Sequence, residues 1–490
     1  MNKRLTWSVI VISLFIATWG LSATAQDQAL EKAVRSIKAC DPYEYTKAMA
    51  SPEFEGRLTG SEGYTKAAKW AAAKFKEWGL RPISAKEGYL QSYPSPYVLV
   101  DKAEMTLLIP ESFAAAKPVF KETPLAVNKD FMPLLYSDSG RNEAPLVFAG
   151  WGISAPELGY DDYAGMDVQG KFVLCFRGTP DRAERRFEDH DQHRARMALA
   201  KSKGALGVIY IYPDDEVSAN PNGDWIAGFT PGEVGERIAD MVLKEKSTNC
   251  ADLKKVLTTI KRPLSFALAS RLRYAVESRH FPDGVGYNVA AYVEGSDPVL
   301  RKEVVIFGGH FDHCGRHMGF VYPGADDNAS GSATVMAIGR ALAGLRPKRS
   351  MMVVLFGGEE LGLQGSTYFA DHVPAAFTKV AAMFNFDMTG EGDGAWGGVS
   401  GEPAEFKTTV EEADKATKLL GGLMVMRHVG VRSSDFAPFF LKGVPSASFG
   451  SNGPHLAYHQ VGDTIYRINP EITADLARLG LRAGYAWAQR

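Results

Sequence analysis

The sequence is poor in cysteine, and its few cysteines are scattered. Four occur in 490 residues, and none forms a C-x-x-C pair. This spacing excludes a disulfide-dense scaffold and a zinc knuckle built on cysteine pairs. One structural disulfide is compatible with the spacing, but the sequence does not select its partners. The four candidates are Cys40, Cys175, Cys250 and Cys314.

Neither sign of charge predominates. Lys and Arg number 55 against 57 Asp and Glu, which gives a formal net charge of -2. A protein that binds nucleic acid through a basic surface is therefore disfavoured, and we expect no nucleic-acid partner. The 45% hydrophobic content excludes a disordered chain. At roughly 100 to 200 residues per domain, the length predicts more than one domain.

Several common hydrolytic and nucleotide-binding motifs are missing. There is no H-E-x-x-H, which would place two zinc ligands on one helix, and no G-x-S-x-G nucleophile elbow. The phosphate-binding pattern G-x-x-x-x-G-K-[ST] is also missing. Any hydrolytic chemistry must therefore come from another arrangement of side chains.

Long apolar runs are missing beyond the start of the chain. Residues 1–25 combine the basic Lys3 and Arg4, an apolar stretch and the small-residue sequence Ala23-Thr24-Ala25. This pattern predicts a cleavable export signal, and hence a periplasmic or extracellular protein with no stable membrane span after signal removal. The alternative is an uncleaved membrane anchor, because the run approaches the shortest length that spans a bilayer.

The remaining chain has three predicted parts. Residues 26–130 form the first part of a main domain. Residues 131–280 contain short apolar strands separated by Gly and Pro turns, which predicts an inserted β-rich module. In residues 281–490, strands that are apolar on both faces alternate with helices. This pattern predicts an α/β fold with a mostly parallel sheet covered by helices.

Polar side chains follow three successive strands of residues 281–490, and an acidic cluster precedes the helix after the first of these strands. The carboxyl ends of parallel strands meet at one edge of a sheet, where ligands bind. We therefore expect these side chains to converge. They are His310, Asp312, Asp326, Asp327, Glu359, Glu360 and Asp387.

Such a gathering of carboxylates requires a positive charge, because the groups repel one another and lose hydration. Carboxylates and imidazole without thiolate fit zinc, with manganese and cobalt as rivals. His459 is a weaker candidate ligand, with His455 as a nearby competitor, and Cys314 is interpreted as a bystander. The alternative is a solvated acidic rim with one satisfied histidine.

In this order, His310-x-Asp312, Asp326-Asp327-Asn328, Glu359-Glu360, Asp387 and Tyr458-His459 resemble the motifs of the co-catalytic zinc exopeptidases. That family contains secreted bacterial aminopeptidases, glutamate carboxypeptidase and the transferrin receptor. The inserted segment is similar to a protease-associated domain. The resemblance implies a zinc exopeptidase fold, two zinc ions per chain, and release of N-terminal residues from peptides or proteins.

The resemblance also implies a ligand set. Asp327 would bridge the two zinc ions. His310 and Asp387 would complete one ion, and Glu360 and His459 the other. Thus the main domain, residues 26–130 and 281–490, would be the catalytic domain, with its metal site in the second part.

Two further roles follow from the resemblance. Asp312 would orient His310, and Glu359 would be the general base, which takes a proton from water and returns it to the leaving amine. The sequence departs from the family pattern at Phe436, where histidine is usual, and at Cys314, where small polar residues are familiar.

Alternative functions remain open on the same scaffold. A carboxypeptidase would need arginines for the terminal carboxylate of its substrate, and Arg427 and Arg432 are candidates. A glutaminyl cyclase would work with one metal. A non-catalytic binding protein like the transferrin receptor would have a degraded site, against which the complete ligand set argues. Nothing in the sequence indicates the oligomeric state.

Overall fold

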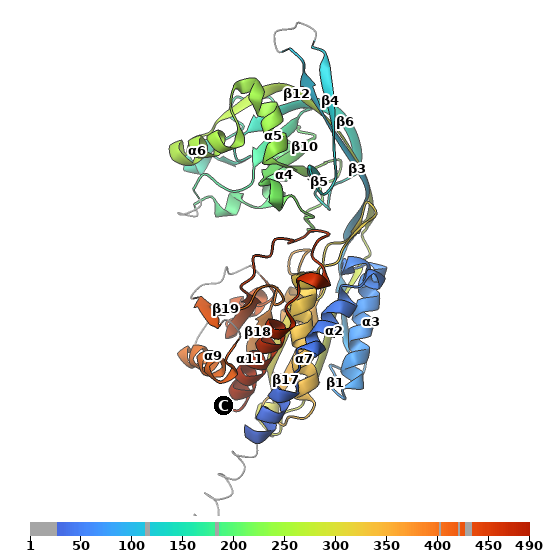
Figure 1. Cartoon of the computed structure of the whole chain (residues 1–490), viewed down its shortest axis with the longest axis vertical. Helices are drawn as coiled ribbons and strands as arrows, with labels where there is room; N and C mark the ends of the chain where they lie inside the picture. The colour runs from blue at the N-terminus through green and yellow to red at the C-terminus, as the bar shows by residue number, and fades with distance from the viewer. Residues whose placement is uncertain (1–26, 113–117, 182–185, 401–402, 420–421, 427–433) are drawn as a thin grey trace, which may run out of the picture.

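The structure is a computed structural model, and it describes residues 27–112, 118–181, 186–400, 403–419, 422–426 and 434–490. The predicted export signal lies outside these ranges, and so do Arg427 and Arg432. In the described part of the chain, no helix has both the length and the apolar character needed to cross a membrane. Figure 1 shows two bodies, one above the other, connected by long strands along one side.

The lower body in Figure 1 is built on a nine-stranded sheet. Its strands in the described ranges are β1 (Arg81–Pro82), β2 (Leu90–Pro94), β13 (Val285–Val293), β14 (Glu303–His310), β17 (Ser350–Phe356), β18 (Lys379–Phe386), β19 (Ala395–Ser400), β20 (Leu423–Met426) and β21 (Ser446–Ser451). They lie in the order β1-β13-β17-β14-β18-β21-β19-β20, and β2 also pairs with β13.

The central strands of this sheet are parallel, and the sheet as a whole is mixed. β14 pairs in parallel with β17 and β18, and β18 pairs in parallel with β21. β13 and β19 lie antiparallel to their neighbours β17 and β21. Helical crossovers join β14, β17 and β18, which gives parallel pairs, whereas β13 and β19 enter from turns or loops. The predicted α/β class, with a sheet covered by helices, is confirmed, and the sheet is mixed rather than purely parallel.

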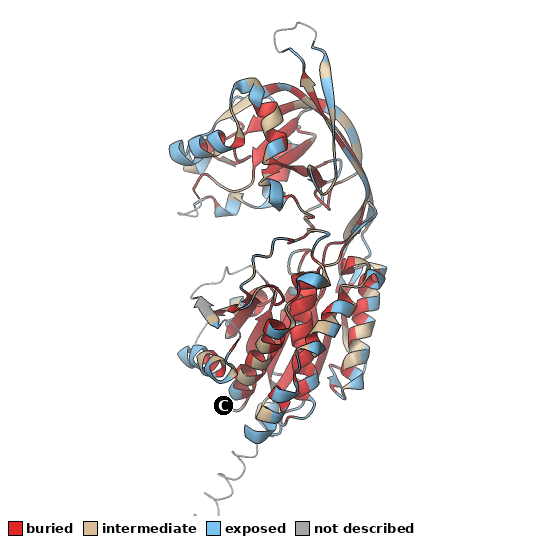
Figure 2. Ribbon diagram, viewed as in Figure 1, coloured by how far each residue is buried: buried red, intermediate tan, exposed pale blue. Residues whose placement is uncertain are grey.

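Helices cover both faces of this sheet. They are α2 (Cys40–Met49), α3 (Glu62–Glu77), α7 (Gly331–Leu342), α8 (Gln364–Asp371), α9 (Ala404–Thr417), α10 (Ala437–Leu441) and α11 (Pro470–Ala488). α8 and α10 pack on one face, and the other helices pack on the opposite face. Figure 2 shows buried strands between helices whose outer surfaces are exposed.

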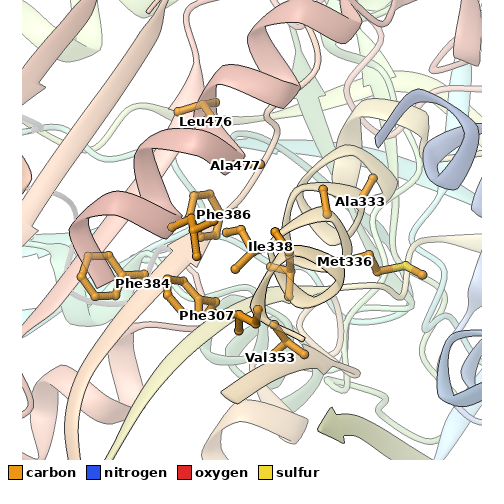
Figure 3. Close-up of a cluster of buried hydrophobic side chains, with 14 of the residues drawn as sticks. Phe307, Ala333, Met336, Ile338, Val353, Phe384, Phe386, Leu476 and Ala477 are labelled. Carbon is orange, nitrogen blue, oxygen red and sulfur yellow. The ribbon is translucent and has the colours of Figure 1, made fainter. Parts of the chain in front are cut away.

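A cluster of aromatic and aliphatic side chains joins the sheet to its helices (Figure 3). Phe307 of β14 and Phe384 of β18 lie with Ile338 of α7 and Leu476 of α11. Ile306, the neighbour of Phe307, belongs to the cluster on the opposite face, with residues of α8 and α10. Both faces of each central strand are therefore buried, which explains their continuous apolar sequences.

The upper body contains an eight-stranded sheet. Its strands and helices are β3 (Tyr97–Pro110), β4 (Phe120–Leu125), β5 (Phe131–Pro133), β6 (Gly140–Ala149), β9 (Phe172–Phe176), β10 (Gly207–Tyr212), β11 (Gly232–Gly235), β12 (Ser265–Phe281), α4 (His193–Ser202), α5 (Glu236–Leu243) and α6 (Cys250–Ile260). β3 and β12 pair along their length and reach toward the lower body. This sheet spans Tyr97 to Phe281, so β3 and β4 precede the predicted start of the insert at residue 131.

The four cysteines are free in the structure. Cys40 is exposed, and Cys175, Cys250 and Cys314 are buried. The disulfide that the sequence left open is therefore not formed.

Candidate metal centre

The structure brings the predicted site residues to the carboxyl ends of the central strands. β14 ends at His310, which is aligned with Phe356 at the end of β17. Asp387 follows the last residue of β18. The parallel pairing of these strands therefore places the segments that follow them at one edge of the sheet. The ligand atoms form two adjoining groups around Asp327.

The first group surrounds the Nε2 atom of His310. This nitrogen lies 3.4 Å from Asp327 Oδ1 and 3.4 Å from Asp387 Oδ1. Glu359 Oε2 lies 4.0 Å from the same nitrogen. One imidazole and two carboxylates thus face a common point, with a third carboxylate at its margin.

The second group surrounds the Nε2 atom of His459. This nitrogen lies 3.1 Å from Asp327 Oδ2 and 3.1 Å from Glu360 Oε2. Asp327 therefore turns one carboxylate oxygen to each group. This geometry fits the bridging position implied by the family resemblance.

Asp312 contacts residues of both groups without belonging to either of them. Its Oδ1 lies 3.6 Å from His310 Nδ1. The same carboxylate accepts the backbone N–H groups of Glu359 at 3.3 Å and Glu360 at 3.4 Å. The family resemblance implies a contact of Asp312 with His310 alone, whereas the structure also places Asp312 beside the backbone of both glutamates.

The electrostatics of the buried side chains fit a cation. Burial opposes the protonation of His310 and His459, yet the surrounding acidic groups hold the pKa of each imidazole well above its usual range. Burial raises the pKa of Glu359 well above its ordinary value, with further contributions from Glu360 and Asp387. The site therefore attracts positive charge, and a divalent ion would supply it.

An unpartnered nitrogen is a second sign of fit. His459 Nε2 is buried and has no hydrogen-bond partner among the described residues, although two carboxylates approach it. Its other ring nitrogen, Nδ1, lies 2.9 Å from the carbonyl oxygen of Ala219. A carbonyl on Nδ1 leaves Nε2 free to bind a metal, which is the usual arrangement of a ligating histidine. The donor set of imidazoles and carboxylates suits zinc.

Three residues that support the site have no role predicted from the sequence. Asp463 accepts the backbone N–H groups of Asp326 and Asp327 at 2.8 and 3.0 Å. Ser434 donates its hydroxyl to Asp387 Oδ2 at 2.6 Å. The fully buried Arg57 donates to the carbonyls of four residues that flank the site loops, and burial lowers its pKa to about 10. These residues are Met49, Phe311, Pro323 and Gly324.

Two histidines near the predicted ligands have different surroundings. His455 lies 2.5 Å from Asp326 Oδ2 and is absent from the ligand groups of the described residues. His313, which the sequence analysis did not consider, places Nδ1 2.9 Å from Glu360 Oε1. The sequence did contain a signal for His313, because it is a second histidine three residues after the predicted ligand His310.

The upper body contributes directly to the site. The backbone N–H of Ala219 donates to the carbonyl of His459 at 2.9 Å, so the two segments exchange hydrogen bonds. Gln460 Nε2 also donates to the carbonyl of Asp215 at 2.9 Å. A cavity of about 600 Å³ lies beside these contacts, lined by Glu359 and Glu360 from below and by residues of the insert from above.

Comparison with known proteins identifies this arrangement. Residues 288–483, which contain all seven predicted site residues, match the profile of peptidase family M28. This part of the chain is similar to peptidase family M28. Residues 142–238 match the PA domain, which lies in the upper body and precedes the M28 segment. The predicted resemblance to zinc exopeptidases with an inserted protease-associated domain is thereby confirmed.

Similar proteins include two curated bacterial enzymes. The chain is 34% identical to leupeptin-inactivating enzyme 1 of Streptomyces exfoliatus over 33% of its own length and 34% of that protein. It is 25% identical to aminopeptidase YwaD of Bacillus subtilis over 67% of its own length and 63% of that protein. The chain thus spans less than two thirds of either relative.

The fold of the chain also matches solved structures. The aminopeptidase from Aneurinibacillus sp. strain AM-1 superposes with a TM-score of 0.64, at 22% identity, over 94% of this chain and 96% of that chain. The peptidase M28 precursor from Shewanella amazonensis SB2B gives a TM-score of 0.61, at 20% identity, over 96% and 97%. Both bodies of the chain therefore belong to the shared architecture.

Proposed function

We propose that this protein is a zinc-dependent aminopeptidase with two zinc ions per chain. The observation that carries the proposal is the position of Asp327, whose two carboxylate oxygens face His310 and His459 separately. Asp387 completes the first group of donors, and Glu360 completes the second. The aminopeptidases among the similar proteins support the same activity.

The metal ions, Glu359 and Asp312 would have different roles in the reaction. The two zinc ions would polarise the scissile carbonyl and lower the pKa of the attacking water. Glu359 Oε2 receives the proton of that water and delivers it to the nitrogen of the leaving amine. Asp312 holds the backbone of both glutamates, so Glu359 faces the reacting groups while Glu360 stays on the ligand side.

The complete donor set distinguishes this proposal from two alternatives. A glutaminyl cyclase would work with one metal, whereas Asp327 here faces two separate groups. A receptor-like binding protein would have lost ligands. The five proposed ligands are all present and buried or nearly buried: His310, Asp327, Glu360, Asp387 and His459.

The charge of the cavity favours an amino terminus over a carboxyl terminus. Asp215 and Glu216 of the insert, both exposed, line the cavity opposite Glu359 and Glu360. Among the described residues that line it, there is no lysine or arginine. Negative walls attract the ammonium group of a peptide and repel its terminal carboxylate, so a carboxypeptidase is disfavoured.

A substrate panel tests the proposal. Free and N-acetylated forms of the same aminoacyl and peptide substrates are offered to the protein, with and without a chelator. We expect hydrolysis of the free forms alone, lost with the chelator and restored by zinc. Hydrolysis of the acetylated peptides would favour the carboxypeptidase, and chelator-resistant activity would contradict a metal-dependent reaction.

We further propose that the protein is exported. The basic start, apolar stretch and small residues of positions 1–25 support this. N-terminal sequencing of protein recovered from the periplasm or medium should begin near Gln26. Recovery in the cytoplasm with residues 1–25 intact would contradict export.

A further inference from the structure

Cys314 lies beside two donors of the second group, Glu360 and His459. The ligand atoms of His313, Cys314, Glu360 and His459 all lie within 4.8 Å of one another. All four residues are buried. The sulfur is therefore near enough to a ligand atom of Glu360 and to a ring nitrogen of His459 to share an ion with them.

An unpartnered nitrogen points to a ligand at the same place. His459 Nε2 is buried without a hydrogen-bond partner among the described residues, although Asp327 Oδ2 and Glu360 Oε2 each lie 3.1 Å from it. Leaving a buried polar atom unpaired costs about 1 to 3 kcal/mol, so each such atom requires an explanation. A cation at the centre of the group explains His459 Nε2.

The other buried cysteines do not share these surroundings. Cys175 and Cys250 are free and buried, but neither occurs in a group of potential metal ligands among the described residues. The backbone of Cys314 is also fixed, because His317 Nε2 lies 2.9 Å from the Cys314 carbonyl oxygen. Burial alone therefore does not account for the placement of this thiol beside Glu360 and His459.

We propose that Cys314 is a thiolate ligand of the second metal position, together with Asp327, Glu360 and His459. This inference rests on the proposed function, because it assigns a further donor to the same centre. On binding, the S–H bond breaks, a sulfur–metal bond forms and the proton passes to solvent, with no change of oxidation state. His313 remains on Glu360 and holds that carboxylate in place.

A thiolate makes the two metal positions chemically different. The position of His310 and Asp387 has nitrogen and oxygen donors, whereas the position of His459 gains a soft sulfur donor. Soft thiolate ligands favour zinc, whereas carboxylate oxygens also suit manganese. The second position is therefore the more selective of the two for zinc.

Cobalt spectroscopy tests this inference without an activity assay. The metal-free full chain is titrated with Co²⁺, and its absorption is compared with that of Cys314→Ser and of the matched control Cys175→Ser. We expect a near-ultraviolet sulfur-to-cobalt charge-transfer band in the wild-type protein and in the control. Cys314→Ser should lose this band and keep the visible bands of bound cobalt.

The possible failures are distinguishable. Visible cobalt bands without a charge-transfer band in the wild-type protein would overturn the thiolate ligand and leave the proposed function intact. Survival of the band in Cys314→Ser would also overturn it. A wild-type protein that binds no cobalt and no zinc would contradict both the thiolate ligand and the proposed metallopeptidase.

Discussion

At the scale of single residues, the two oxygens of Asp327 have separate surroundings. Oδ1 faces His310 and Oδ2 faces His459. The backbone of Asp327 is fixed by the Asp463 carboxylate, which accepts its N–H. A bridging carboxylate must keep both oxygens in position, and this backbone contact limits its freedom to turn.

Removal of the Asp327 carboxylate should therefore affect both metals. We predict that Asp327→Ala loses both zinc ions, whereas exchange of the exposed Asp393 for Ala leaves the zinc content unchanged. Elemental analysis of the purified proteins measures this. An Asp327→Ala protein that retains its zinc would rule out the bridging position.

Glu359 should be separable from metal binding. It lies 4.0 Å from His310 Nε2 and is placed to exchange protons, because burial holds its pKa above the ordinary range. We predict that Glu359→Gln binds the same amount of zinc and loses turnover by about 10²- to 10⁴-fold, the usual contribution of a general base. Near-normal turnover with full zinc content would refute the role.

The site residues that directly follow strands could be predicted from the sequence, whereas the residues that hold these site residues in place could not. His310, Glu359 and Asp387 could be predicted, because strand ends in a parallel sheet converge. Asp463 and Ser434 act through hydrogen bonds between segments far apart in sequence, and no local pattern reveals such contacts. His313 was readable beside His310, but periodicity alone gave it no role.

At the scale of elements, α11 packs directly against the sheet at two glycines. A Cβ atom added at Gly484 would overlap the ring of Phe307 in β14. The same holds at Gly480 and Phe386 in β18. Glycine at these two positions therefore sets the distance between helix and sheet.

A methyl group at Gly484 should lower stability. We predict that Gly484→Ala reduces the free energy of unfolding by about 1 to 3 kcal/mol, the usual cost of overpacking a core. Gly344→Ala is the control, since nothing lies within 4 Å of an added Cβ there. Denaturant unfolding compares the two, and an equal effect in both would contradict the close approach.

His317 joins two elements as a neutral imidazole. His317 is the last residue of β15 (Gly315–His317). Its Nδ1 accepts the backbone N–H of Val100 in β3 at 3.0 Å, and its Nε2 lies 2.9 Å from the carbonyl oxygen of Cys314. Burial lowers its pKa from 6.5 to about 4. Protonation would remove the acceptor for Val100.

The neutral form of His317 makes stability depend on pH. Between pH 6.5 and 4 the unfolded chain binds a proton at His317 more readily than the folded chain does. The contribution of His317 to the free energy of unfolding is therefore complete above pH 6.5 and declines as the pH falls toward 4. The decline amounts to about 3 kcal/mol. Unfolding at several pH values should show a smaller decline in His317→Gln, and identical pH profiles would contradict the neutral imidazole.

The positions of the central strands could be predicted from the sequence, but the directions of the outer strands could not. The strands of the central sheet were readable, because both faces are buried and their sequences are continuously apolar, as in Val304 to Phe307. The antiparallel positions of β13 and β19 were not readable. Strand direction depends on the path of the connections, which local hydrophobicity does not encode.

At the scale of the whole molecule, the two bodies meet at the metal centre. The insert supplies the carbonyl of Ala219 to a proposed ligand, His459, and supplies acidic residues to the cavity. Composition indicated a separate β-rich module, but not that it would contact a ligand. That contact joins positions 240 residues apart, and sequence spacing offers no sign of it.

The central claim is that two divalent ions occupy the two groups that share Asp327. Anomalous diffraction from crystals of the zinc-loaded protein, recorded at the zinc absorption edge, tests this most directly. We predict two peaks about 3.5 to 4 Å apart, one beside His310 and Asp387 and the other beside Glu360 and His459. Absence of zinc from these positions, with the side chains ordered and directed apart, would contradict the account.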